Sequence, residues 1–381
     1  MMQNPEQVNA LEDYLSSLYI LSHSESTVSS YRMAIINKNK VGFRDFLHQK
    51  YNLDEIQLAD KIKNGDLDTY KILKEFVIFL DKFGYKPKSI QGRMAAVKGY
   101  LRHLGVKVHS EDYKQNVRLP KTLRHREEPM TKEIILRVLR NVPPKIQTVI
   151  LVLTASGMRI GELVQLKLSD IDFGTNPTTI RLRAETTKTR EARETFLTSE
   201  ATNSLKDYLR RYFGWKDGQE NEHLKDVAIF GRTSLVKSKK RTPDTKQSSY
   251  LLMSGLLMKI LSYYLDKVPG LDNKNSNGRR VIHFHAFRKF FRTTVGNVCG
   301  RDFAESLIGH HFYMDTYYNM TSEKQREMYL KAEPYLTISD ATKMESSLKY
   351  LSEKYQKLEA KYNNLMMRLD EISIPTPNMS Q

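Results

Sequence analysis

The chain has 381 residues, with 61 Lys and Arg against 44 Asp and Glu, a formal net charge of +17 and a single cysteine, Cys299. This length is enough for two or three domains, and the basic excess favours a polyanionic partner, nucleic acid before a membrane surface. One cysteine excludes an internal disulfide and a thiolate zinc site, and the most apolar run, residues 146–155, is too short to cross a membrane. We therefore expect a soluble, cytoplasmic (nucleoid-associated) protein.

Residues 1–115 are predicted to form a helical domain. Apolar residues at spacings of three and four predict helices over 8–19, 27–36 and 68–83, with a further element beginning at Phe43. The apolar side of the third helix is expected to consist of Ile72, Leu73, Phe76, Ile78, Phe79 and Leu80. Ser89 is a candidate cap for the next helix, 90–104, which ends at Gly105.

This last helix carries four cations among its apolar residues, Lys88, Arg93, Lys98 and Arg102. They form either a solvated surface or a face that lies on a DNA backbone. Residues 117–131 add further Lys and Arg, two prolines and few apolar residues, which is typical of an extended linker. We therefore expect a DNA-binding domain over 1–115 and a basic linker over 116–130.

A second domain is predicted over 131–338. Thr131 caps its first helix, and a nearly all-apolar helix follows from the Pro143-Pro144 pair until Gly157 ends it. Arg159 then lies at a turn between two helices. A guanidinium there needs a ligand or a structural partner, for which Glu162 is the candidate.

Alternating residues over 179–184 predict a strand with Ile180, Leu182 and Ala184 facing inward, and 193–197 predict its returning partner. Lys188 then lies at the tip of a β-hairpin, although a lone loop lysine is usually only solvated. Further along, Ser199 is expected to cap a helix that ends at Phe213, and another helix is predicted over 251–265. Between them, 214–249 is expected to be a mobile, phosphate-touching insertion with basic residues at Lys237, Lys239, Lys240 and Arg241.

The helix predicted over 285–299 presents a basic cluster opposite an aromatic stripe. Its buried stripe is expected to consist of Phe287, Phe290, Phe291, Val295 and Val298. His285, Arg288 and Arg292 fall on the other side. This cluster is either a solvated basic face or an anion site, and guanidinium forks match phosphate oxygens. A short helix over 302–308 follows, stopped by Gly309.

The tail, 339–381, is predicted to be a coiled-coil helix with a disordered end. Its heptad seam consists of Met344, Leu348, Leu351, Tyr355, Leu358, Tyr362, Leu365, Leu369 and Ile372. Such a seam pairs with a neighbour or docks on its own protein. The two tyrosines would make a dimer seam bulky, so both possibilities stay open.

Several motifs occur in a fixed order, namely Arg159 on its turn, Lys188 on a hairpin, His285 with Arg288, Gly309 with His310, and then a tyrosine. This ordered set resembles the tyrosine recombinase (phage integrase) family, over roughly residues 8–335. The segments that carry it are 153–172, 285–291 and 307–310. The segment 332–336 and the tail look more like integrases of archaeal mobile elements.

The resemblance implies a mainly α fold with a small β-hairpin or sheet, in which a helical core-binding domain precedes a mixed α/β catalytic domain and a coiled-coil tail. It also implies a site-specific DNA recombinase, or integrase, that cuts and rejoins double-stranded DNA through a 3′-phosphotyrosyl intermediate without metal, ATP or another cofactor. Family members usually work as homo-oligomers, a dimer on one site and a tetramer at synapsis.

The roles that the resemblance implies are phosphate binding by Arg159 and Arg288, leaving-group protonation by Lys188, proton transfer by His285, a phosphate hydrogen bond from His310 and nucleophilic attack by Tyr318. The tyrosine is doubled in this chain. Tyr318 is preferred because its spacing from His310 fits better, with Tyr317 as the alternative. His310 is preferred over His311 because Gly309 precedes it.

Two other functions fit parts of this pattern. A type IB topoisomerase-like enzyme uses the same chemistry to relax DNA, but a separate first domain and an oligomerising tail favour recombination at paired sites. A non-catalytic architectural DNA-binding protein would explain the charge and the coiled coil, but it has no use for the full set of catalytic residue types.

Overall fold

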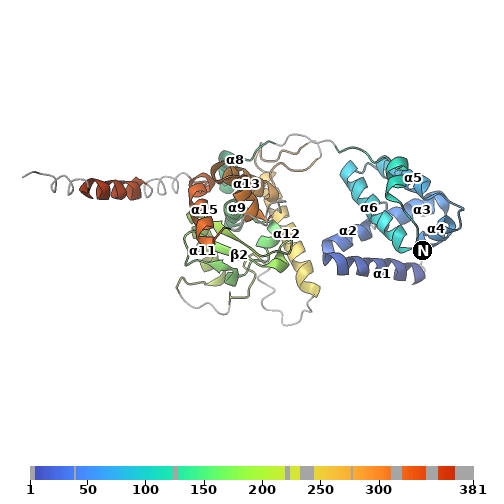
Figure 1. Cartoon of the computed structure of the whole chain (residues 1–381), viewed down its shortest axis with the longest axis horizontal. Helices are drawn as coiled ribbons and strands as arrows, with labels where there is room; N and C mark the ends of the chain where they lie inside the picture. The colour runs from blue at the N-terminus through green and yellow to red at the C-terminus, as the bar shows by residue number, and fades with distance from the viewer. Residues whose placement is uncertain are drawn as a thin grey trace, which may run out of the picture. The chain divides into compact units, whose positions relative to one another are not determined.

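The computed structural model describes residues 5–37, 40–122, 128–218, 224–231, 244–275, 278–309, 320–339 and 351–364. The chain folds as two compact units, Met1–His125 and Arg126–Gln381 (Figure 1). The fold is mainly helical with one small antiparallel sheet, as the sequence predicts. No helix in the described ranges is long and apolar enough to span a membrane.

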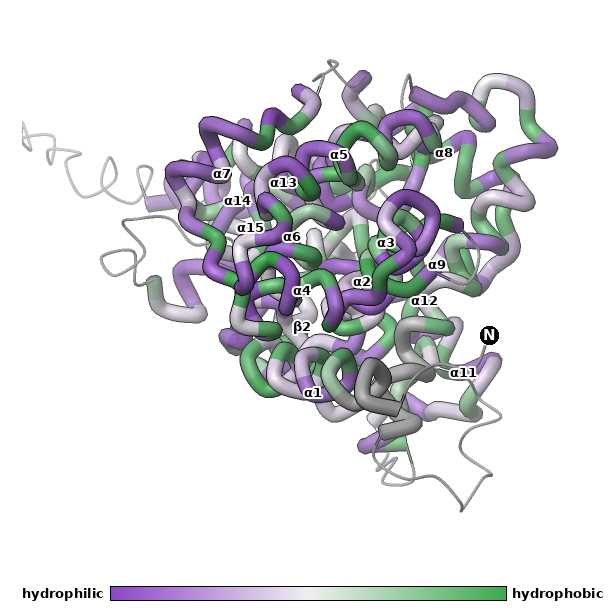
Figure 2. The backbone as a smooth tube through the Cα atoms, turned by 90° about the vertical axis from the view of Figure 1, so that its right-hand side faces the viewer, coloured by the Kyte–Doolittle hydropathy of each residue, from purple (hydrophilic) through white to green (hydrophobic). Residues whose placement is uncertain are grey.

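The first unit is built from seven helices within its described residues. They are α1 (Pro5–Ser22), α2 (Glu25–Ile35), α3 (Phe43–Tyr51), α4 (Glu55–Lys63), α5 (Thr69–Lys82), α6 (Pro87–His103) and α7 (Ser110–Asn116). Their tubes alternate between hydrophobic and hydrophilic within single turns, as amphipathic helices do (Figure 2). The apolar sides of α3, α5 and α6 meet in one core.

Three details of this unit differ from the sequence prediction. Helix α6 begins at Pro87 rather than after a Ser89 cap, since proline suits the first helical position. On α5 the side chain of Ile78 is 47% exposed, and Val77 is buried in its place. Ile78 lies about 200° around the helix from Phe76, so the two cannot share one narrow stripe. Helices α4 and α7 were not predicted.

Three of the four cations on α6 are held by the unit itself. Arg93 donates to two backbone carbonyls and lies over the Tyr85 ring, and Lys98 lies 3.8 Å from the centroid of the Tyr113 ring. Arg102 donates to the carbonyl of Val108 at 2.9 Å. Lys88 is exposed. Arg102 is also exposed, so this face is partly solvated, and its contact with DNA stays a prediction.

The second unit packs its helices around α9 and α13 (Figure 1). Its helices are α8 (Lys132–Arg140), α9 (Pro144–Ser156), α10 (Ile160–Leu163), α11 (Ser199–Phe213), α12 (Asp244–Leu265), α13 (Phe284–Cys299), α14 (Arg301–Ile308) and α15 (Ser322–Leu336). Its sheet has the order β1 (Ile171–Asp172), β2 (Thr178–Leu182) and β3 (Arg193–Leu197), with 3₁₀ turns at Leu168–Asp170 and Ala184–Thr186.

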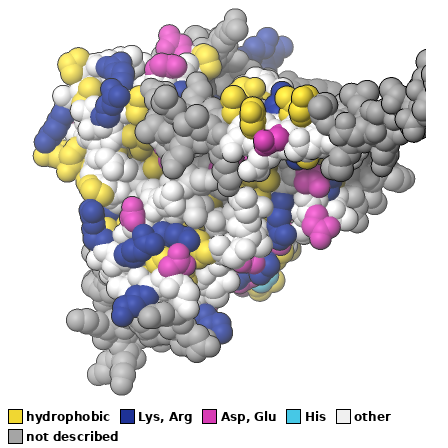
Figure 3. All heavy atoms as spheres, turned by 90° about the vertical axis from the view of Figure 1, so that its left-hand side faces the viewer, with side chains coloured by type: hydrophobic (Ala, Val, Ile, Leu, Met, Phe, Trp, Pro, Cys, Tyr) yellow, Lys and Arg dark blue, Asp and Glu magenta, His cyan; other side chains and the backbone are white. Residues whose placement is uncertain are grey.

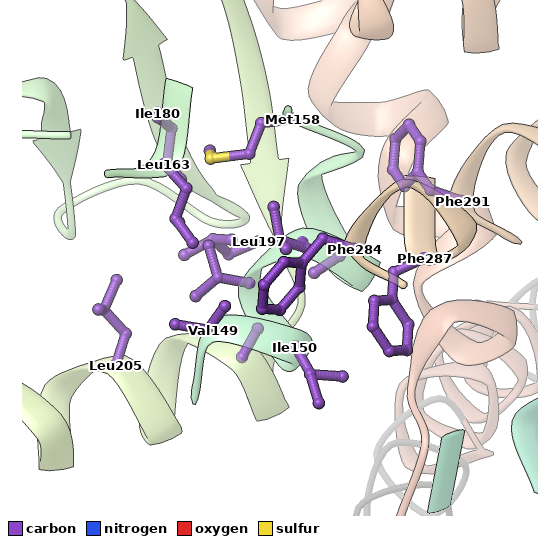
Figure 4. Packing of buried hydrophobic residues seen from close by; sticks show 14 of the residues in the cluster. Val149, Ile150, Met158, Leu163, Ile180, Leu197, Leu205, Phe284, Phe287 and Phe291 are labelled. Carbon is purple, nitrogen blue, oxygen red and sulfur yellow. The ribbon is translucent and has the colours of Figure 1, made fainter. Parts of the chain in front are cut away.

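The core of this unit joins the sheet to the central helices. Figure 4 shows Phe284 and Phe287 of α13 beside Ile150 of α9, with Leu197 of β3 near them. The aromatic rings on α13 are therefore core residues. Val298, which the predicted stripe included, is 37% exposed instead, because α13 has reached the edge of the core there.

Three predicted boundaries in this unit are wrong. Strand β2 ends at Leu182, opposite Arg193, and Ala184 already belongs to a 3₁₀ turn. Helix α11 is capped by Thr198, whose side chain accepts from the amide of Ala201, so Ser199 is its first helical residue. Helix α12 begins at Asp244, earlier than predicted.

The stretch predicted as a polar insertion is partly core. Leu224, Ile229 and Phe230 are buried there, and the amide of Ile229 donates to the carbonyl of Leu166. The four basic residues Lys237, Lys239, Lys240 and Arg241 lie outside the described residues. At the other end of the unit, the amides of Ile338 and Ser339 donate to Glu200, which fixes the chain after α15.

Candidate active site

Arg159 is positioned by the end of α9. Gly157 closes that helix with a left-handed φ of +63°, and an added Cβ there would lie 2.2 Å from the Phe291 ring. The chain then turns so that Arg159 precedes α10. Its backbone amide and its guanidinium both donate to Glu162, at 2.7 and 3.0 Å. The predicted structural pair is therefore present, and 24% of the Arg159 side chain remains exposed.

A second arginine completes the environment of Glu162. Arg193, the first residue of β3, donates to the same carboxylate at 2.7 Å and to the carbonyl of Leu307 at 3.0 Å. Burial alone would raise the pKa of Glu162, but the charges of Arg193 and Arg159 more than offset it, so the pKa of this carboxyl lies below its usual value. Glu162 therefore stays ionised and orients both guanidiniums.

Arg288 is buried rather than displayed on an open helix face. Only 2% of the residue is exposed, and its guanidinium donates to the carbonyls of Gly157 and Ile308 at 2.7 and 2.6 Å. Burial and the nearby Arg159 charge lower the pKa of Arg288 to about 9, which leaves it charged at neutral pH. The predicted solvated alternative is therefore wrong for this residue, because α14 folds over that side of α13.

His285 lies one turn before Arg288 on the exposed side of α13. Desolvation of its ring and the positive charges of Arg288 and Lys289 lower the pKa of His285 below its usual value of 6.5. The imidazole is therefore neutral at pH 7, and a neutral imidazole can accept a proton.

Arg292, the third member of the predicted cluster, pairs with an acid on α14. It donates to Glu305, whose side chain is 3% exposed. Arg301 approaches the same carboxylate at 3.8 Å. This pairing joins α13 to α14 beside Arg288.

These elements enclose a cleft of about 610 Å³. Its lining consists of Arg159, Thr189, His285, Arg288, Lys289, Arg292, Arg301, Glu305, Ile308 and Gly309. Five of these ten residues are Lys or Arg and only one is acidic. On the face drawn in Figure 3, by contrast, basic side chains lie among acidic ones. The cleft therefore concentrates positive charge and fits an anion.

Lys188 is exposed at the tip of the hairpin and does not line the cleft, although its neighbour Thr189 does. The tip is closed by Thr187, which donates to the carbonyl of Glu191 and accepts from its amide. His310, His311, Tyr317 and Tyr318 lie outside the described residues. Within the described ranges, no group of three or more His, Cys, Asp or Glu is placed to hold a metal ion.

The sequence motifs predicted Arg159, His285 and Arg288 as site residues, and the structure places all three at one cleft. The motifs did not predict Arg193 or Glu305. Arg193 opens a strand, and strand alternation says nothing about a long side chain that reaches a different element. Glu305 lies on a short helix whose apolar residues carry the only visible pattern. The signal that could have found it was its spacing of four from Arg301.

Comparison with known proteins agrees with these motifs. The model of the phage integrase family matches residues 121–324, more than half of the chain. The tyrosine recombinase XerA of Thermococcus kodakarensis is 30% identical over 112 residues, which cover 29% of this chain and 38% of the relative. The XerA of Pyrococcus furiosus is 28% identical over 127 residues, covering 32% and 43%. Each match therefore spans less than half of the relative.

The fold is similar to that of a lambda integrase dimer whose crystal structure contains a COC′ core site. That likeness covers 82% of this chain and 98% of the other at 15% identity, with a TM-score of 0.50. At this identity it speaks for the fold alone. The family match covers the cleft and both motif-bearing regions, and the chain therefore belongs to the phage integrase family of tyrosine recombinases.

Proposed function

We propose that this protein is a site-specific DNA recombinase, an integrase that cuts and rejoins double-stranded DNA through a 3′-phosphotyrosyl intermediate. The observation that carries the proposal is the cleft itself. Arg159 and Arg288 come from motifs more than a hundred residues apart and line one cationic cleft with a neutral His285. A phosphodiester is the anion that two guanidiniums and a proton acceptor fit best.

In this proposal Arg159 and Arg288 bind the non-bridging oxygens and stabilise the charge that develops in the transition state. Arg159 presents an exposed part of its side chain, and Arg288 lines the cleft with a guanidinium that the protein already holds in place. A buried charge of this kind is strong because little water screens it.

The remaining roles concern protons. A tyrosine phenol has an ordinary pKa near 10 and is a weak nucleophile at neutral pH, so neutral His285 is proposed to take its proton. The nucleophile is proposed to be Tyr318, with Tyr317 as the alternative, and His310 is proposed to hydrogen-bond the phosphate. Lys188 is proposed to protonate the departing 5′-oxygen, which requires its side chain to reach the cleft that the neighbouring Thr189 lines.

The first unit and the tail are assigned to binding and assembly. We propose that residues 1–115 form the DNA-binding, core-binding domain and that 116–130 is the basic linker that follows it. Self-association is assigned to the heptad tail, in which Leu351, Tyr355, Leu358 and Tyr362 are 61–68% exposed in the single chain. A mobile-element origin, of the archaeal type, is part of this proposal.

The test is covalent trapping on nicked duplexes. Sites are first recovered from a random duplex pool by binding to the protein. Wild type, Tyr317→Phe, Tyr318→Phe and Arg159→Ala are then compared on a denaturing gel. We expect an adduct from wild type and Tyr317→Phe, none from Tyr318→Phe, and at least a hundredfold slower formation by Arg159→Ala, on the order expected for removal of one transition-state donor.

DNA affinity is measured in parallel, because Arg159→Ala should still bind DNA. An adduct lost only in Tyr317→Phe would keep the function and exchange the two tyrosines. No adduct from wild type, on DNA that it demonstrably binds, would overturn the proposal. Relaxation of supercoiled plasmids that lack the recovered sites would instead indicate topoisomerase-like activity.

A further inference from the structure

Arg193 joins the hairpin to two of the elements that carry the candidate site, α10 and α14. It is the first residue of β3, five residues after Lys188, and its backbone pairs with Leu182 across the hairpin. Its side chain reaches Glu162 at 2.7 Å in the motif segment 153–172 and the carbonyl of Leu307 at 3.0 Å at the start of the motif segment 307–310. One guanidinium therefore ties the hairpin to two of the motif-bearing segments.

The fit around this guanidinium is close. Only 9% of the Arg193 side chain is exposed. Gly309 has a left-handed φ of +65°, and a Cβ added there would lie 3.0 Å from Arg193 Cδ and 3.1 Å from its Nε. Glycine is therefore required at position 309 for two reasons, the left-handed backbone conformation and the space that the Arg193 side chain occupies. Arg193 also has one buried nitrogen that has no hydrogen-bond partner among the described residues.

The buried group around Glu162 has a net positive charge. Arg159 and Arg193 share the single carboxylate of Glu162, and Arg288 is buried next to them on neutral carbonyls. These three arginines and one carboxylate therefore have a net charge of two positive units. A buried positive excess is stable only if rigid contacts hold it or an anion enters. The bonds from Arg193 supply such contacts.

We propose that Arg193 is a positioning residue, which holds Glu162 against Arg159 and fixes the hairpin to the last turn of α14, so that the phosphate clamp is assembled before DNA arrives. This inference rests on the proposed recombinase function. Arg193 does not line the cleft and need not touch DNA. Its effect should therefore appear in the rate of cleavage rather than in DNA affinity.

The test uses single-turnover adduct formation at saturating protein, comparing Arg193→Gln with Arg181→Gln. Arg181 is a matched control, since it lies on β2 of the same hairpin, is 58% exposed at its side chain and bonds Asp172 and Glu194 rather than Glu162. We expect Arg193→Gln to slow adduct formation by about tenfold to a hundredfold, as small misplacements of catalytic groups do. Arg181→Gln should stay within about threefold of wild type, and the Kd for DNA should change by less than about threefold in both.

Two further readouts separate positioning from general damage. A methylphosphonate at the cleaved position lacks the charge that the clamp neutralises, so the Arg193→Gln deficit should shrink on that substrate. A variant that is merely misfolded would be equally slow on both. If Arg193 acts through Glu162, the double variant Glu162→Gln/Arg193→Gln should be no slower than the slower single variant.

The outcomes distinguish this inference from the function on which it rests. No adduct from wild type would count against the recombinase itself. An adduct from wild type, with Arg193→Gln as fast as Arg181→Gln or equally impaired on both substrates, would overturn the positioning role. If Arg193→Gln is unfolded at the assay temperature, Arg193→Lys enters the same comparison. Its single ammonium cannot reproduce the fork to Glu162 and Leu307, so it should show the same selective slowing.

Discussion

At the scale of single residues, the site works by placing charges where water cannot screen them. Glu162, Arg193 and Arg288 are all largely buried, yet each has a defined partner. His285 differs, since it lies on the exposed side of α13, where desolvation of its ring and the nearby cations lower its pKa. The pKa of His285 is therefore the property of the site that a nearby substitution can change most easily.

The lowered pKa of His285 predicts a pH profile. If neutral His285 accepts the tyrosine proton, cleavage falls only when the pH drops below this lowered pKa, which lies under 6.5. Removing the neighbouring cation with Lys289→Gln should raise the pKa of His285 and move the acid limb of the rate profile to higher pH. The measurement is the rate of adduct formation from about pH 5 to about pH 8, the range in which histidine titrates.

Lys259→Gln is the control, because this exposed lysine on α12 does not line the cleft. An acid limb that stays in place in Lys289→Gln would show that another group controls it.

At the scale of elements, the site depends on how helices end. Gly157 ends α9 at φ +63°, with the Phe291 ring in the place of any side chain. Gly157→Ala is expected to lower the free energy of unfolding by at least about 2 kcal/mol, from backbone strain and overpacking together. Urea denaturation of the full chain measures it.

Gly255→Ala on α12 is the paired experiment. A Cβ at that helical position meets nothing within 4 Å, so the substitution should raise stability by about 0.5–1 kcal/mol. Equal effects of the two substitutions would contradict the packing described around Gly157.

The ends of helices could be predicted from the sequence where only a few residue types suit the position. Gly157, Gly309 and the cap at Thr131 could be identified because only certain residues suit those positions. Ser89 and Ser199 looked like caps by the same logic, but α6 begins at Pro87 and α11 is capped by Thr198. Local preference cannot decide between two candidates that lie so close in the chain.

The residues within each motif of the site could be predicted from the sequence, but the contacts between distant residues could not. His285 and Arg288 fall three residues apart, so their proximity follows from the helix period. The bond from Arg193 to Glu162 joins residues 31 apart in the chain, and the Arg288 bond to Gly157 spans 131. Such contacts depend on how α14 and the hairpin pack, which no local pattern records.

At the scale of the whole molecule, the described part of the tail, 351–364, is a helix that packs against no other described residue. Residues 351–364 form a helix in which every position is exposed. A heptad seam that stays in water is typical of a helix whose partner is another chain. The positive charge of the chain, +17, opposes self-association at low salt, so any association through the seam has to overcome that repulsion.

This predicts a tail-dependent oligomer. Leu351→Asp/Leu358→Asp should shift the DNA-free protein to monomer, whereas Ala360→Asp, on the opposite side of the helix, should not. Sedimentation velocity over a range of protein concentrations gives the result. Identical association by both variants would assign assembly to some other surface.

The buried guanidinium of Arg288 has one more consequence. It donates to carbonyls at two helix ends, that of Gly157 after α9 and that of Ile308 at the end of α14, which have no partner inside their own helices. Arg288 therefore caps two helices, whereas Arg159 caps none with its side chain. In a lineage released from selection for cleavage, position 159 should drift early, while position 288 should keep its arginine for as long as the domain has to fold.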